Sequence, residues 1–175
     1  MTTAERLLAP DLLDDLASRP IDEVRRLRAQ CIDVETGLSY LRRMVQGPLD
    51  IVHREQVRRS TGVDGDLATL VDELPTVLAE HTRSGGVGRL PQTLEPTELD
   101  PVLQTELDAL VGGGRIGKVT GMSDADLADL ADDLAAFERK VSQQRHAFFE
   151  RIDALQAELT RRYKTGEASV QSLLD

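Results

Sequence analysis

Apolar residues recur at alternating steps of three and four residues in two long stretches of the chain. The first stretch contains Val24, Leu27, Cys31, Val34, Leu38, Leu41 and Val45. The second contains Leu127, Leu130, Leu134, Phe137 and Val141 and, after a shift in phase, Phe148, Ile152, Leu155 and Leu159. This spacing places the apolar side chains along one seam of an α-helix, as in a coiled coil. The pattern therefore predicts two long helices that pack against each other.

The residues that flank the two seams indicate where the helices begin and end. Pro20 suits the opening turn of the first helix, because the N–H that proline lacks would have no partner there. Ser123 can cap the exposed N–H groups of the second helix, whose first turn is acidic. The second pattern ends just before Gly166, a residue type that commonly terminates helices. We therefore expect long helices over 20–59 and 123–164.

A Gly47-Pro48 pair interrupts the first seam. A proline inside a helix removes one backbone hydrogen bond and clashes with the carbonyl group one turn earlier. We therefore expect a kink or a break at this pair. Apolar residues continue the pattern beyond it, so the helical stretch is expected to reach about residue 59.

The rest of the chain predicts shorter helices and loops. Residues 1–19 form a short helical segment, residues 60–122 form an acidic connector, and residues 165–175 form a tail. Within the connector, helical patterns run over 66–81 and 100–111, and a glycine-rich loop separates them. The expected fold is all-α: a long antiparallel two-helix coiled coil with short helices in the connecting segment.

A polar motif, E-x3-S-x2-R-x3-Q-x3-D, accompanies the seam of the first helix. Its members share one narrow stripe of the helix surface, because their spacing matches about 3.6 residues per turn. They are Glu35, Ser39, Arg42, Gln46 and Asp50. Each directly follows an apolar residue. The polar stripe is therefore expected along the edge of the contact between the helices.

The second helix repeats this motif with a constant offset of 103 residues and one substitution. The second set is Glu138, Ser142, Arg145, Phe149 and Asp153, with phenylalanine in the place of glutamine. In an antiparallel pair a pseudo-two-fold axis would relate the two sets, and we expect residue 35 to lie level with 153 and residue 50 with 138. Such a site suits a partner that is itself two-fold symmetric.

The residue types of the motif favour nucleotide recognition. Arginine offers a planar donor fork for a phosphate or for the N7/O6 edge of guanine. Aspartate can accept hydrogen bonds from the N1–H and N2–H₂ edge of guanine, serine can donate to a phosphate, and glutamate can hold an arginine in place. The alternative is a solvated coiled-coil edge, on which the same residues form ion pairs without any ligand.

With these motifs the chain resembles the RsiG family, the cyclic-di-GMP-dependent anti-sigma factors of actinobacteria. The run from Val34 to Arg43, VETGLSYLRR, is typical of that family, and the resemblance covers both long helices. It implies a cyclic-di-GMP dimer clasped between the helices and a loaded protein that sequesters a WhiG-like sporulation sigma factor. The implied ligand residues are Glu35, Ser39, Arg42, Gln46, Asp50, Glu138, Ser142, Arg145 and Asp153. Phe149 is expected to contribute to packing more than to ligand contact.

Composition narrows the remaining possibilities. Asp and Glu number 31 against 21 Lys and Arg, and the formal net charge of −10 disfavours direct binding to nucleic acid or to anionic membranes. The chain has no secretory signal and no apolar run long enough to span a bilayer, so we expect a cytoplasmic protein. A single cysteine and scattered histidines predict no disulfide and no metal site.

Two further functional classes compete with the regulatory one. The run at 112–118 matches G-x4-G-K, but Val119 stands where a P-loop needs Ser or Thr, so we expect a hinge and no enzyme activity. A coiled-coil module that binds its partner without nucleotide remains the alternative to a cyclic-di-GMP-dependent anti-sigma factor. Because both motif copies lie in one chain, we expect a monomer with an intramolecular site.

Overall fold

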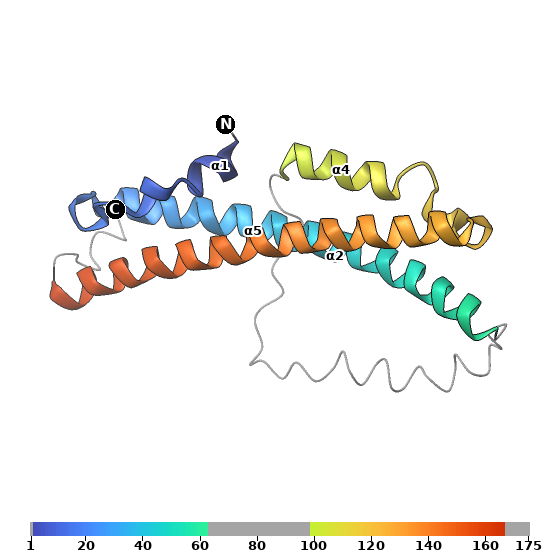
Figure 1. Ribbon diagram of the computed structural model, residues 1–175. Coiled ribbons are helices and arrows are strands. Elements are labelled where there is room, and N and C mark those ends of the chain that lie inside the picture. The colour runs from blue at the N-terminus through green and yellow to red at the C-terminus, as the bar shows by residue number, and fades with distance from the viewer. Residues whose placement is uncertain (1, 63–98, 167–175) are drawn as a thin grey trace.

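The computed structural model describes residues 2–62 and 99–166, and the regular elements of these residues are all helical (Figure 1). Two long helices dominate the fold: α2, Ile21–Thr61, and α5, Asp124–Thr165. Shorter elements lead into each long helix. These are α1 (Thr3–Leu7), η1 (Pro10–Leu13) and η2 (Leu16–Ser18) before α2, and α4 (Pro101–Val111) and η3 (Ile116–Gly121) before α5.

The long helices lie side by side and run in opposite directions (Figure 1). Contacts at both ends fix this orientation. Near the start of α2, Arg25 donates a hydrogen bond to the Tyr163 hydroxyl near the end of α5. Near the end of α2, Arg59 Nη1 lies 2.6 Å from Oδ1 of Asp124 at the start of α5. The predicted all-α fold with an antiparallel pair of long helices is confirmed.

The helix ends follow the local signals in the sequence. Pro20 occupies the N-cap of α2, and the Ser123 side chain caps α5 by accepting from the Asp126 N–H at 3.1 Å. Gly62 and Gly166 follow the two helices with φ of 65° and 76°. Because glycine has no Cβ, it adopts this left-handed conformation without steric cost and allows the chain to leave the helix.

Pro48 does not break α2, which continues without interruption from Ile21 to Thr61. In Figure 1 the second half of the helix slants away from α5. The neighbouring seam residues Val45 and Val52 are both fully buried. Burial on both sides of the proline therefore offsets the missing hydrogen bond. Of the two outcomes that the Gly47-Pro48 pair predicts, a kink or a break, the break does not occur.

The two predicted seams form the core between α2 and α5. Fully buried members include Val24, Cys31, Val45, Leu130, Leu134, Val141, Phe148 and Leu155. Burial raises the pKa of the Cys31 thiol to about 11, so this side chain stays protonated and acts as a small apolar residue. The apolar periodicity thus identified the buried faces of both helices.

The helices α1 and α4 lie on the same side of the long pair (Figure 1). Leu7 of α1 is buried, and α4 buries Leu103 and Leu107. Asp100 caps α4 by accepting from the N–H groups of Val102 and Leu103 at 2.9 and 3.2 Å. The helix expected over 66–81, the loop after it and most of the expected tail lie outside the described residues.

No helix within residues 2–62 and 99–166 combines the length and the apolar character that crossing a bilayer requires.

Candidate functional site

The two polar motifs meet across the α2–α5 interface in a pair of reciprocal ion pairs. Arg42 Nε donates to Glu138 Oε1 at 2.8 Å, and Arg145 Nε donates to Glu35 Oε1 at 2.9 Å. Each arginine therefore contacts the glutamate of the opposite motif. The constant sequence offset between the motifs reappears as a pseudo-two-fold relation between the two ion pairs.

The serines of the motifs complete this arrangement. Ser39 Oγ donates to Glu35 Oε1 at 2.7 Å, and Ser142 Oγ donates to Glu138 Oε1 at 2.9 Å. One oxygen of each glutamate thus accepts from a serine on its own helix and from an arginine on the other. We call these side chains, Glu35, Ser39, Arg42, Glu138, Ser142 and Arg145, the central network. All are half-buried.

Electrostatics hold Glu138 of the central network in its charged form. The Arg42 guanidinium, with help from the Ser142 hydroxyl, lowers the pKa of Glu138, although burial acts in the opposite direction. The carboxylate is therefore ionised at neutral pH and pairs with a permanently charged arginine. Because the network contains two arginines and two glutamates, its charges balance internally.

The expected register between the motifs is wrong. Residue 35 lies next to Arg145 rather than level with 153, and Glu138 contacts Arg42 rather than facing residue 50. The difference is about two helical turns along the axis. Helical periodicity sets the angle of a side chain around its helix but leaves the axial offset between two helices open; packing of the seams sets that offset.

As a consequence, the last residue of each motif lies beyond an end of the central network. Asp50 follows Arg42 by about two turns of α2, and Asp153 follows Arg145 by the same distance on α5. Both side chains are exposed. Neither forms a hydrogen bond or an ion pair with any residue in the described part of the chain. The Glu, Ser and Arg positions come together, whereas the Asp positions lie outside them.

The fourth motif position differs between the helices in structure as well as in sequence. Gln46 is half-buried, and its side chain makes no hydrogen bond with other described residues. Phe149 is 39% exposed, and the Arg145 guanidinium carbon lies 4.9 Å from the centre of its ring. The Phe149 ring is therefore not part of the core, whereas the adjacent Phe148 is fully buried.

Sequence reasoning missed a second set of paired charges near the ends of the long helices. Near the end of α2, buried Glu55 accepts from Arg58 Nε at 2.8 Å and from Arg59 Nε at 2.7 Å. Near the end of α5, Glu158 accepts from Arg161 Nε at 2.9 Å and from Arg162 Nε at 2.6 Å. We call these groups the terminal clusters.

Each terminal cluster attaches the segment that leads into the other long helix. Arg59 Nη2 donates to the carbonyl groups of Val119 and Thr120 at 3.2 and 3.3 Å. Arg162 donates to the carbonyl groups of Leu16 and Arg19, the latter at 2.7 Å. The clusters share the 103-residue offset of the motifs. That offset, followed beyond the motif, is the sequence signal that would have revealed them.

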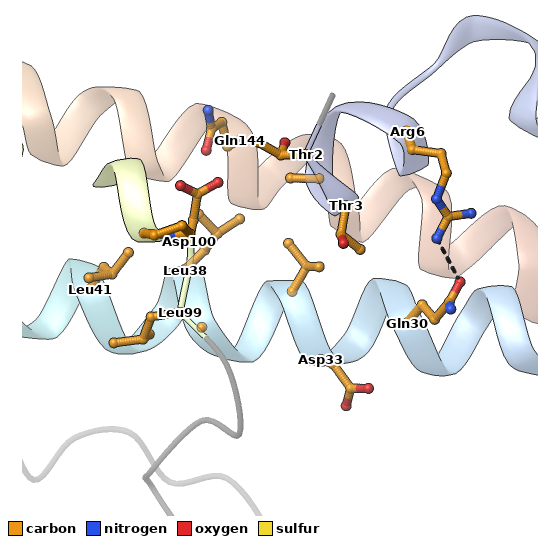
Figure 2. Close-up of a pocket in the computed structure, with 14 residues that line it drawn as sticks. Thr2, Thr3, Arg6, Gln30, Asp33, Leu38, Leu41, Leu99, Asp100 and Gln144 are labelled. Carbon is orange, nitrogen blue, oxygen red and sulfur yellow. Dashed lines mark hydrogen bonds between the residues drawn. The ribbon is translucent and has the colours of Figure 1, made fainter. Parts of the chain in front are cut away.

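One cavity of the described region lies beside the apolar seam and outside the central network. A cavity of about 510 Å³ opens between α1, α2 and the start of α4 (Figure 2). Its α2 lining includes the seam residue Leu41, and also Asp33 and Gly37, which lie on the side of the apolar seam opposite the polar stripe. Members of the central network do not line it. The two edges of the seam therefore face different surroundings.

The glycine-rich run at 112–118 follows a helix, α4, rather than the strand that precedes a P-loop. Gly113 and Gly114 have φ of 63° and 71°, and the chain then enters η3. The run serves as a turn into the segment that Arg59 holds. Among the described residues, no group of three or more His, Cys, Asp or Glu side chains is arranged to hold a metal ion.

Comparison with known proteins supports the relation that the motifs suggested. A family model described as RsiG-like matches residues 10–78 and 114–175, which include both motifs and both terminal clusters. A comparison with curated proteins finds no match. Membership in the matched family implies a regulatory anti-sigma role rather than an enzymatic one. The match spans most of the chain, and the chain therefore belongs to the RsiG-like family.

Proposed function

We propose that this protein is an anti-sigma factor that binds cyclic-di-GMP across α2 and α5 at the two motifs. In its loaded form it sequesters a WhiG-like sporulation sigma factor. The observation that carries the proposal is the central network, in which the Glu and Arg of each motif pair with those of the other motif and each Ser donates to the Glu of its own motif. A solvated coiled-coil edge does not require two equivalent copies of such an arrangement.

The geometry of the arginines suits an anionic or guanine ligand. Arg42 and Arg145 each use Nε for a glutamate, and their terminal N–H groups make no hydrogen bond with other residues of the described part. These groups remain available for a phosphate or for the O6 and N7 atoms of guanine. The glutamates fix the guanidinium planes in advance, which lowers the entropy cost of binding.

The ends of the site suit the bases of the ligand. Cyclic-di-GMP is two-fold symmetric, with two guanines and two phosphodiesters, and the motif pair has the same approximate symmetry. Asp50 and Asp153 are exposed carboxylates that can accept from the N1–H and N2–H₂ groups of guanine. The exposed ring of Phe149 offers a face on which a base can stack, with Arg145 already on it.

The identity of the protein partner, a sigma factor, is inferred from the family relation and agrees with the negative charge of the chain. A protein with a formal net charge of −10 is electrostatically complementary to a partner that carries basic surfaces for DNA binding. Because both motifs lie in one chain and meet within it, the nucleotide site is complete without a second copy.

Removing either central arginine tests the nucleotide site. In Arg42→Ala or Arg145→Ala, a charge-assisted contact worth about 1.5–3 kcal/mol is lost, so cyclic-di-GMP affinity should fall at least tenfold. Titration calorimetry measures the affinity, and circular dichroism shows whether the helix content is retained. Arg43→Ala is the matched control, because Arg43 is exposed and adjacent to Arg42 but lies off the stripe. Native affinity in both folded variants would contradict the site assignment.

The alternative is a protein-interaction module that needs no nucleotide. The observation in its favour is that the ion pairs of the central network are satisfied without any ligand. This alternative predicts that the native chain binds its protein partner equally well with and without cyclic-di-GMP.

A further inference from the structure

Arg28 stands out among the basic residues of the long helices. Its Nε is the one buried side-chain nitrogen or oxygen of the described residues that lacks a hydrogen-bond partner. The side chain is half-buried and forms no ion pair with any other residue in the described ranges. Residues three and four positions away on α2 are Val24, Arg25, Cys31 and Ile32, so no carboxylate stands at ion-pairing distance along the helix.

Arg28 lies on the polar stripe although it is not part of the motif. It precedes Glu35 by seven residues, which is about two helical turns and returns the side chain to nearly the same face. Because the helices are antiparallel and Glu35 contacts Arg145, the next turn of α5 after Arg145 lies in the direction of Arg28. That turn carries Phe149. Arg28 and Phe149 therefore lie toward the same end of the site, on facing helices.

The opposite end of the site has no equivalent of this pair. The 103-residue offset relates Arg28 to Ala131, a buried small residue, and relates Phe149 to Gln46. Both departures from the repeat thus fall at one end, where they add a cation and an aromatic ring. The two ends of an otherwise pseudo-symmetric site differ in charge and in stacking surface.

The motifs carry more negative than positive charge, so an anionic ligand needs a further cation such as Arg28. The two motifs together contain two arginines against four carboxylates, and both arginines are neutralised by glutamates. A cyclic dinucleotide brings two further negative charges, one on each phosphodiester. Asp153 lies toward the same end as Arg28, but its side chain is exposed and forms no ion pair with Arg28. Arg28 is a positively charged side chain on the stripe without an ion-pair partner among the described residues, and such a group attracts an anionic ligand.

We propose that Arg28 binds a phosphodiester of the nucleotide and makes the two halves of the site unequal. The ligand class is a cyclic dinucleotide phosphodiester, and the inference rests on the proposed nucleotide-binding function. The buried Nε is already removed from water before the ligand arrives, so a charge-assisted hydrogen bond from this guanidinium meets a smaller desolvation cost.

The variant Arg28→Met separates ligand binding from a structural role. Methionine retains an apolar stem of similar shape and removes the charge and the unpaired nitrogen. We expect cyclic-di-GMP affinity to fall about tenfold and the melting temperature to stay level or rise, since a buried donor without a partner is removed. Raising the salt concentration should weaken nucleotide binding by the native chain more than by the variant.

Cyclic-di-GMP is titrated in parallel into the native protein and into the variants Arg28→Met, Arg42→Ala and Arg43→Ala. Arg43→Ala, which removes an exposed arginine off the stripe, should bind as the native chain does. If the native chain binds, Arg42→Ala weakens binding and Arg28→Met binds like the native chain, the role of Arg28 is refuted and the nucleotide site stands. A lower melting temperature with unchanged affinity would assign Arg28 to structure. No binding by the folded native chain would refute both proposals.

Discussion

Single residues decide how the repeated motif becomes a site. Glu35 and Glu138 occupy equivalent positions, and each contacts the arginine of the other motif. At the fourth motif position, however, the same helical angle holds Gln46 on one helix and Phe149 on the other. This position lies at the border between core and surface. The repeat therefore predicts its location on the stripe, but not whether a phenylalanine there would point inward.

The roles of the two adjacent phenylalanines can be separated by truncation. Phe149 is 39% exposed and Phe148 is fully buried, although they are neighbours in the chain. Phe148→Ala should destabilise the fold by about 3–5 kcal/mol, because it opens a cavity between the long helices. Phe149→Ala should leave the unfolding free energy nearly unchanged and weaken cyclic-di-GMP binding through the lost stacking surface.

Urea denaturation followed by circular dichroism measures the unfolding free energy, and calorimetry measures the affinity. If Phe149→Ala destabilises the fold as strongly as Phe148→Ala and leaves nucleotide binding intact, Phe149 serves packing and the stacking assignment is wrong.

At the scale of elements, much of the fold could be predicted because apolar spacing and caps act locally. The seams of α2 and α5, the Ser123 cap and the helix after Asp100 all follow from patterns within a few residues. The continuity of α2 through Pro48 could not be predicted this way, since tertiary packing outweighs a local penalty there. The axial register of the helices likewise depends on contacts between distant segments, and the carboxylates at the ends of the site follow from that register.

The terminal clusters show how the long helices hold the segments before them. Arg59 and Arg162 each bind a glutamate on their own helix and backbone carbonyl groups of the segment leading into the other helix. These contacts join segments that are far apart in the sequence. The clusters therefore stabilise the ends of the antiparallel pair, whereas the central network stabilises its middle.

The terminal clusters predict that stability depends on acid pH. The paired arginines lower the pKa values of Glu55 and Glu158 from 4.5 to about 2. Because the folded-state pKa lies below the unfolded value, this contribution to stability is present above about pH 4.5 and is lost as the pH falls toward 2. The melting temperature should therefore decrease over this range when it is followed by circular dichroism.

A Glu55→Gln, Glu158→Gln double variant is the control for this pH dependence. It should melt at a lower temperature than the native chain at neutral pH, and the difference should shrink as the pH approaches 2. An equal pH dependence of melting in both proteins would mean that the terminal clusters contribute nothing to acid sensitivity.

At the scale of the whole molecule, the antiparallel pair has two different sides. The helices α1 and α4 pack on one side (Figure 1). The polar stripe runs along the other edge of the apolar seam. A ligand on the stripe contacts α2 and α5 together, because each motif is completed by the other helix. Its binding energy therefore adds to the stability of the paired arrangement, by about 2.7 kcal/mol at a hundredfold excess over the dissociation constant.

This coupling leads to a prediction about the sigma factor. If the sigma factor recognises the loaded arrangement, cyclic-di-GMP must increase the affinity of the protein for it. By linkage the sigma factor must then increase nucleotide affinity by the same factor, because both routes reach the same ternary complex. Titrations of a WhiG-like sigma factor with and without nucleotide, and of nucleotide with and without the sigma factor, measure the two factors. In Arg42→Ala, at least tenfold more cyclic-di-GMP should be needed for the same increase in sigma-factor affinity, while the helix content is retained. Equal sigma-factor affinity at zero and saturating cyclic-di-GMP would support the nucleotide-independent module instead, since a ligand without differential affinity for the two states shifts nothing.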